Sequence, residues 1–172
     1  SDAMQKDFIN RGVPKIKLSL IHNPIDKGIR KLDCLIRFPG KGLRLVVVGR
    51  LVLQKGIDRL IPLIANVKNS HLTIIGDGPE INKIKSLVSA KNVKNRIKYT
   101  GFINNHNSYI AGADYLLLPS RWEGLPNVAL ESLILGTPVL TFKEIVGLKD
   151  FINLVPKNKL LFFDNEREMQ DK

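Results

Sequence analysis

Two cations in this sequence are placed where a phosphate group could be held. Arg50 follows, after Gly49, the nearly continuous apolar run at residues 43–48, and Lys55 stands just before Gly56 at the start of a predicted helix. The free amides at a helix start favour an anion. Arg50 and Lys55, on either side of that start, are therefore a candidate clamp for a diphosphate. The alternative is that they are two surface cations with no ligand.

Two carboxylates bracket the start of a second predicted helix. Glu123 lies in the polar loop after the apolar run at residues 115–118, and Glu131 lies one turn inside the helix that begins near Leu125. Gly124, between them, allows a ligand to approach the backbone closely. Carboxylate oxygens accept hydrogen bonds from the hydroxyls of a sugar or a ribose. The alternative is that Glu123 caps the helix and Glu131 is an exposed helical side chain.

The same helix start offers positive charge to an anion. Its free amides lie at about Asn127 and Val128, and Asn127 shares a helix face with Glu131. The result is an anion-binding helix start between two carboxylates. A nucleoside diphosphate sugar carries a matching order of groups, with a ribose, two phosphates and a hexose. These residues therefore predict a nucleotide-sugar site.

Short apolar strands and amphipathic helices alternate along the chain and must position these residues. Pro62 lies inside the first predicted helix, which we expect to start late or bend there. Strands are predicted over residues 16–21, 43–48, 72–75, 96–100, 115–118, 137–142 and 160–163, and helices over 56–67, 81–88, 105–111, 125–135 and 143–152. This alternation predicts a Rossmann-like α/β fold, an open parallel sheet of about six strands with helices on both faces. Ligands of such sheets bind outside the carboxyl ends of the strands, where the candidate residues lie.

The composition narrows the class of protein. The 172 residues are 44% hydrophobic, enough for a core, and the length favours a single domain. Cys34 is the only cysteine, which excludes an internal disulfide framework and a cysteine-based zinc site. No apolar run approaches the ~18 residues needed to span a bilayer, and the N-terminus has no signal-peptide pattern. We therefore expect a soluble, cytoplasmic protein.

The formal net charge of +11 is unevenly distributed. Lys and Arg outnumber Asp and Glu by 20 to 7 in residues 1–110 and are outnumbered by 7 to 9 in residues 111–172. A basic half can attract nucleic acid, anionic lipid or phosphorylated ligands. The aromatic residues are not interleaved with the lysine clusters, as a stacking surface for single strands requires. Nucleic acid is therefore not the expected partner.

The sequence lacks the motifs for other common ligands. The stretch from Gly76 to Gly78 begins like the dinucleotide fingerprint, but Ile81 stands at the third glycine position and Pro79 lacks an amide for a phosphate. No P-loop sequence is present. The three histidines lie far apart in the sequence, and none is part of a local carboxylate motif. We therefore predict no metal site and no cofactor.

Several segments, taken in order, resemble the group 1, or family-4, retaining glycosyltransferases. The stretch from Glu123 to Glu131, in the setting Pro-Ser-x-x-Glu-Gly-Leu-Pro-Asn, resembles the donor-site motif of that family. The other matching segments are residues 21–26, which are similar to the Asn-Pro-Ile-Asp hinge between domains, and residues 48–56, 74–80, 99–103 and 135–139. Together the resemblance covers about residues 16–165.

The resemblance implies a GT-B architecture, of which this chain is the C-terminal, donor-binding half. It implies that Arg50 and Lys55 hold the donor diphosphate and stabilise it as a leaving group. It also implies that Glu131 binds the ribose hydroxyls and that Glu123 contacts the hexose. Further donor contacts are implied for Gly49, Gly76, Phe102, Ile103, Gly124, Leu125, Asn127 and Val128, with Phe102 and Ile103 beside the base. The family transfers the sugar with retention and without a metal, and UDP is the expected nucleotide.

The resemblance also sets expectations for the domains. Residues 1–15 would be a tag remnant and lead-in, residues 16–165 the nucleotide-sugar-binding domain, and residues 166–172 a truncated tail. The N-terminal acceptor domain of the family would be missing. Residues 147–152 resemble a loop of members that act on surface polysaccharide and lipopolysaccharide, with Leu148 in place of Pro. We therefore expect a surface glycan as product, and peripheral contact with the inner face of the membrane, because acceptors in the family are often lipid-linked.

Two other functions stay open at this point. The chain could be a non-catalytic remnant, or a partner subunit of a glycosyltransferase encoded by a split gene. It could also bind nucleic acid or an anionic membrane through charge alone. That last function predicts binding that falls steeply with salt.

Overall fold

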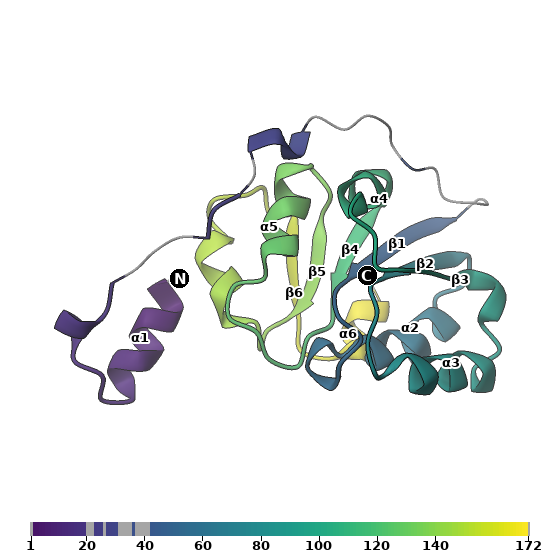
Figure 1. The fold of residues 1–172 in the computed structure, drawn as a ribbon, viewed down its shortest axis with the longest axis horizontal. Helices are drawn as coiled ribbons and strands as arrows, with labels where there is room; N and C mark the ends of the chain where they lie inside the picture. The colour runs from purple at the N-terminus through teal and green to yellow at the C-terminus, as the bar shows by residue number, and fades with distance from the viewer. Residues whose placement is uncertain (1, 20–22, 26, 31–35, 37–41, 172) are drawn as a thin grey trace.

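The structure is a computed structural model that describes residues 2–19, 23–25, 27–30, 36 and 42–171. Its centre is a six-stranded, fully parallel sheet with the strand order β3-β2-β1-β4-β5-β6 (Figure 1). The strands are β1 (Leu43–Val48), β2 (Ser70–Ile75), β3 (Ile97–Gly101), β4 (Tyr115–Leu118), β5 (Val139–Phe142) and β6 (Leu160–Phe163). The predicted Rossmann-like α/β fold is confirmed.

Within the described residues, six α-helices and several short 3-10 helices accompany the strands. The α-helices are α1 (Asp2–Asn10), α2 (Leu60–Asn66), α3 (Ile81–Ala90), α4 (His106–Gly112), α5 (Asn127–Ile134) and α6 (Glu166–Gln170). The 3-10 helices are η1 (Lys15–Lys17), η2 (Lys27–Arg30), η3 (Leu53–Lys55), η4 (Ile57–Arg59), η5 (Lys94–Arg96) and η6 (Val146–Phe151). As predicted, the helix around Pro62 starts late, because η4 precedes α2 and places the proline in its first turn.

Alternation along the strands sends apolar side chains into two cores, one on each face of the sheet. Leu45 and Val47 of β1 pack with α2, α3 and α6, whereas Val46 between them packs with α4 and α5. All three are buried. Strands buried on both faces read as continuous apolar runs, which is why β1 and β4 stand out in the sequence. The two cores fix the sheet, and with it the positions of the loops at its carboxyl edge.

Two predictions about local structure are wrong, and one helix was not predicted. Ile16 and Lys17, expected in a strand, lie in η1, and Ile16 is 95% exposed, so its alternating pattern has no core to face. Residues 20 and 21 of that expected strand, and His22, Asp26 and Cys34, lie outside the described residues. The helix expected over residues 143–152 is the shorter 3-10 helix η6. Asp2–Asn10, for which no element was predicted, form α1, which packs against η6.

Candidate functional site

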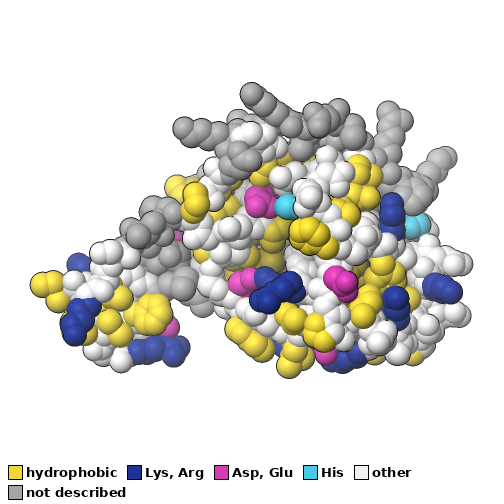
Figure 2. Space-filling view, viewed as in Figure 1, with side chains coloured by type: hydrophobic (Ala, Val, Ile, Leu, Met, Phe, Trp, Pro, Cys, Tyr) yellow, Lys and Arg dark blue, Asp and Glu magenta, His cyan; other side chains and the backbone are white. Residues whose placement is uncertain are grey.

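The loops at the carboxyl ends of β1 and β4 enclose a cleft of about 580 Å³ with the start of α5. It contains eight of the predicted site residues, namely Gly49, Arg50, Lys55, Glu123, Leu125, Asn127, Val128 and Glu131. On the face shown in Figure 2, acidic, basic and histidine side chains gather over the middle of the molecule. Residues between positions 49 and 131 of the chain thus line one cavity at the carboxyl ends of the strands, where ligands of open parallel sheets bind.

A second, mostly apolar hollow of about 300 Å³ adjoins the cleft. Gly76, Phe102 and Ile103, the other predicted donor-site residues from the loops after β2 and β3, lie here. Val48, Gly49, Arg50 and His106 line both cavities, so the two lie side by side. Phe102 is 80% exposed, which leaves its ring free to contact a planar ligand. Of the predicted residues, Gly124 lies in neither cavity and instead lines a hollow beside Trp122.

A close backbone approach shapes the junction of the two cavities. Gly76 has a φ of +133°, and a Cβ there would lie 2.0 Å from the carbonyl oxygen of Gly49. Its amide donates to the carbonyl of Gly101 at 2.8 Å. Only glycine fits this conformation and this space. The loops after β1, β2 and β3 are thus fastened side by side.

Lys55 and Glu123 form an ion pair across the cleft. Lys55 Nζ donates to Glu123 Oε1, and Ser120 Oγ donates to Glu123 Oε2 at 2.8 Å. The lysine and glutamate side chains are 20% and 13% exposed, and Ser120 is fully buried. The carboxylate is therefore held on both oxygens. The fixed carboxylate in turn orients the Lys55 ammonium group at the cleft wall.

The Arg50 side chain forms no hydrogen bond or ion pair with any other described residue, and it is exposed at the cleft. Lys55 is already paired, so the two cations of the predicted clamp differ. Arg50 is the one whose charge is not neutralised within the described part of the chain. An anion that enters the cleft finds this guanidinium free to bind it.

Glu131 also has a partner within the protein. Its Oε2 lies 3.0 Å from Nε2 of His106, the first residue of α4. The side chains of His106 and Glu131 are 28% and 23% exposed. Sequence reasoning assigned no role to His106. Its place shortly after β3, at the carboxyl edge of the sheet, is the signal that could have found it.

Asn23 is a second cleft residue that sequence reasoning left out of the site. Its Nδ2 donates to Asn127 Oδ1 at 2.6 Å and to the Leu125 carbonyl at 3.2 Å. The segment around Asn23 was recognised only as resembling a hinge. These bonds tie it to the first turn of α5, which has no side-chain cap of its own.

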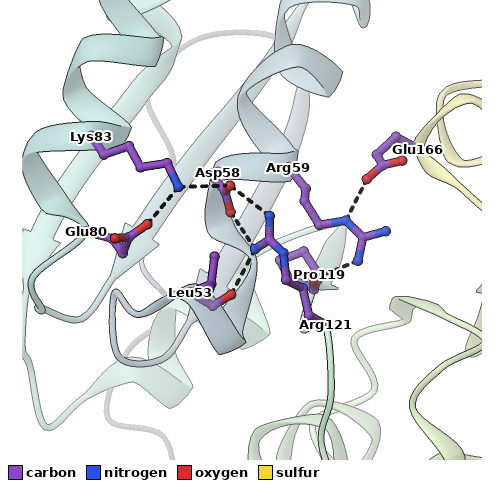
Figure 3. A network of polar contacts seen from close by, with 8 residues as sticks. All are labelled: Leu53, Asp58, Arg59, Glu80, Lys83, Pro119, Arg121 and Glu166. Atoms are coloured by element: carbon purple, nitrogen blue, oxygen red, sulfur yellow. Dashed lines mark hydrogen bonds and ion pairs between the residues drawn. The ribbon is translucent and has the colours of Figure 1, made fainter.

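A polar network holds the loop that carries Glu123 (Figure 3). Both terminal nitrogens of Arg121 donate to the Asp58 carboxylate at 2.8 Å, and Nη1 also donates to the Leu53 carbonyl at 2.8 Å. The Arg121 guanidinium lowers the pKa of Asp58 against the opposing effect of burial. Lys83 lies 3.5 Å from the same carboxylate. The loop after β4 is thereby fastened to the loop that carries Lys55.

No group of three or more His, Cys, Asp and Glu side chains suited to a metal ion occurs within the described residues. No helix in the described part of the chain is both long and apolar enough to cross a membrane.

Comparison with known proteins decides the family. The family described as "Glycosyl transferases group 1" matches residues 36–171. This chain belongs to the group 1 glycosyltransferases. The O-antigen biosynthesis glycosyltransferase WclY of Escherichia coli is 30% identical over 139 residues, which are 75% of this chain and 38% of WclY. The lipopolysaccharide core biosynthesis glycosyltransferase LpsD of Rhizobium meliloti is 30% identical over 105 residues, which are 61% of this chain and 31% of LpsD.

Solved structures share the fold of this glycosyltransferase chain. Anabaena HepE in complex with UDP-glucose superposes with a TM-score of 0.81 at 20% identity, over 99% of this chain and 50% of HepE. The lipopolysaccharide outer core galactosyltransferase WaaB gives a TM-score of 0.79 at 22% identity, over 98% of this chain and 48% of WaaB. The chain thus spans about half the length of these structural neighbours, and its sheet and helices match the GT-B fold.

Proposed function

We propose that this chain is the donor-binding part of a retaining, metal-independent glycosyltransferase that uses a nucleoside diphosphate sugar. The observation that carries the proposal is the pair of adjoining cavities, one apolar and one lined by Arg50, Lys55, Glu123 and Glu131. An apolar hollow suits a base, and cations beside carboxylates suit a diphosphate between a ribose and a hexose.

The donor would lie along the carboxyl edge of the sheet. The base would enter the hollow beside Phe102 and Ile103, and the ribose hydroxyls would donate to Glu131. The diphosphate would lie near Arg50, Lys55 and the first amides of α5. The hexose would reach Glu123. HepE, a structural neighbour with the same fold, is solved with UDP-glucose, which supports UDP as the nucleotide of this chain.

Positive charge at the diphosphate is the chemical contribution we propose for these residues. When the bond between the sugar and the diphosphate breaks, negative charge grows on the departing phosphate oxygens. Arg50 and Lys55 stabilise that charge because they are already in place before the reaction. Lys55 would then be shared between Glu123 and the phosphate. This arrangement supplies the charge that a divalent cation supplies in other enzymes.

We propose a surface polysaccharide or lipopolysaccharide as the product, because the relatives WclY and LpsD act in O-antigen and lipopolysaccharide core biosynthesis. The acceptor would be bound by a further domain, since the chain spans about half the length of its structural neighbours. Residues 149–159 support peripheral contact with an anionic membrane from the cytoplasmic side. Ile152 and Leu154 are 44% and 74% exposed there, among lysines.

Titration calorimetry with UDP, GDP and ADP tests the donor site and identifies the base. We expect binding of one nucleotide, with UDP preferred. No heat with any of the three nucleotides would overturn the proposal. Sedimentation with vesicles of anionic lipid tests the membrane contact separately, and an Ile152→Ser, Leu154→Ser double variant should sediment less than the parent protein.

A further inference from the structure

His106 occupies the point where the apolar and the polar cavity meet. It lines both of them, and its Nε2 atom lies 3.0 Å from Glu131 Oε2. An ionised carboxylate can only accept hydrogen bonds, so the imidazole must be the donor in this pair. The bond therefore fixes the Nε2–H form of the ring toward Glu131.

We infer that His106 is a positioning residue for recognition of the ribose. By donating to Oε2, it holds the Glu131 carboxylate in one orientation and leaves Oε1 to accept from ribose hydroxyls. A glutamate side chain has several rotatable bonds, and fixing it before the ligand arrives reduces the entropy lost on binding. This inference rests on the proposed donor-binding function, to which it adds a residue and a part of the ligand.

The other described residues near His106 and Glu131 support this role of His106. None of them other than His106 forms a hydrogen bond or ion pair with the Glu131 carboxylate. Asn127, one turn earlier on the same helix face, is bonded to Asn23 instead. Lys55 is bonded to Glu123. Without His106, the Glu131 side chain would lose the bond that orients it.

The test compares UDP with 2′,3′-dideoxy-UDP, which has the same base and diphosphate but lacks the ribose hydroxyls. If GDP or ADP is the nucleotide bound, its dideoxy analogue replaces this pair. We expect His106→Ala to weaken binding of the ribonucleotide about tenfold, the size expected for a lost charge-assisted hydrogen bond. Binding of the dideoxy analogue should change less than about twofold. A merely structural role would weaken both ligands equally.

Three variants complete the design. His106→Gln should restore most of the ribonucleotide affinity, because its amide nitrogen reaches about as far as Nε2 and can donate. In a Glu131→Ala background, His106→Ala should have no further effect, because the two residues act as one unit. His71→Ala, on β2 and outside both cavities, is the matched control and should bind like the parent.

The possible outcomes distinguish a failure of the role inferred for His106 from a failure of the proposed donor-binding function. Equal losses for UDP and its dideoxy analogue, or unchanged binding of both, would overturn the role of His106 while the donor site stands. Independent, additive effects of His106 and Glu131 would also overturn it. If the parent protein binds no nucleotide, the proposed function fails, and the inference fails with it.

Discussion

At the scale of single residues, the two glutamates of the site are held by different partners. Glu123 is held by Lys55 and Ser120, whereas Glu131 is held by His106. Glu123 thus balances a cation in the region proposed to hold the diphosphate, and Glu131 lines the side of the cleft that adjoins the apolar hollow. Sequence reasoning located both carboxylates through the sheet-edge rule and the helix start. Their partners are set by tertiary packing across loops far apart in sequence.

Glu131→Ala should weaken nucleotide binding by about 1–3 kcal/mol, because it removes the acceptor proposed for the ribose hydroxyls. Titration calorimetry with UDP measures the loss, and the thermal unfolding midpoint checks that the variant folds. Glu168→Ala, on the exposed side of α6, is the control that should bind normally. Parent-like binding by Glu131→Ala would show that the carboxylate does not contact the nucleotide.

Arg50→Ala should weaken UDP binding and leave uridine binding unchanged, because Arg50 is proposed to contact only the diphosphate. The loss should be about 1.5–3 kcal/mol, as for a hydrogen bond to a charged group. Side-by-side titrations with UDP and uridine measure the difference. Arg167→Ala, an exposed arginine of α6, controls for the loss of one positive charge. An equal loss for both ligands would contradict the phosphate role.

At the scale of elements, packing between loops decides the shape of the site. Gly147 in η6 lies so close to the loop after β4 that an added Cβ would be 2.1 Å from the Gly124 carbonyl oxygen. Leu148, which follows it, is fully buried. The sequence likened residues 147–152 to a loop of enzymes that act on surface glycans, and it did so only by resemblance. The structure shows a packing contact with the neighbour of Glu123.

Gly147→Ala should therefore displace the Glu123–Gly124 loop and reduce binding of UDP-glucose, and the protein should also lose stability. We expect a stability loss of about 1–3 kcal/mol, the usual range for overpacking. Urea unfolding measures it, and calorimetry measures the binding. Gly136→Ala is a poor match because its φ is +83°, so Gly112→Ala, which clashes with Ile36 away from the cleft, is the better control. It should destabilise the fold with less effect on binding.

The ion pair between Asp58 and Arg121 fastens the two loops and makes their stability depend on pH. Arg121 lowers the pKa of Asp58 in the folded protein. The stabilisation is therefore present above the unfolded pKa of about 3.9 and is lost as the pH falls through the folded pKa. Asp58→Asn should cost about 1–3 kcal/mol at pH 7, and its deficit relative to the parent should shrink at acid pH.

Urea unfolding from pH 7 to pH 3 measures this difference. Asp164→Asn is the matched control, since Asp164 pairs with Lys143 at an exposed position and should contribute little. The pKa of Asp114 is also lowered, by Arg44, so the parent loses stability in acid for more than one reason. Only the difference between parent and variant isolates Asp58. A deficit that stays constant with pH would contradict the coupling.

Much of the architecture could be predicted from the sequence. Where the prediction failed, the failure has a physical reason. Buried parallel strands such as β1 and β4 are nearly continuous apolar runs, so their positions and the binding edge could be predicted. Ile16 belongs to an alternating pattern with no sheet to join, and local periodicity cannot show this. His106 and Asn23 enter the site through contacts with α5, which only the folded chain brings near them.

At the scale of the whole molecule, the chain spans about half the length of its structural neighbours, and the residues proposed to bind the donor all lie within it. Donor binding and sugar transfer should therefore separate. Incubated with UDP-glucose, the chain should bind the donor but release no UDP above the rate of a protein-free blank, because acceptor binding is assigned to a further domain. Chromatography of the nucleotide measures release, and calorimetry on the same sample measures binding. UDP release that is abolished by Arg50→Ala would show that this half carries out the chemistry without a second domain.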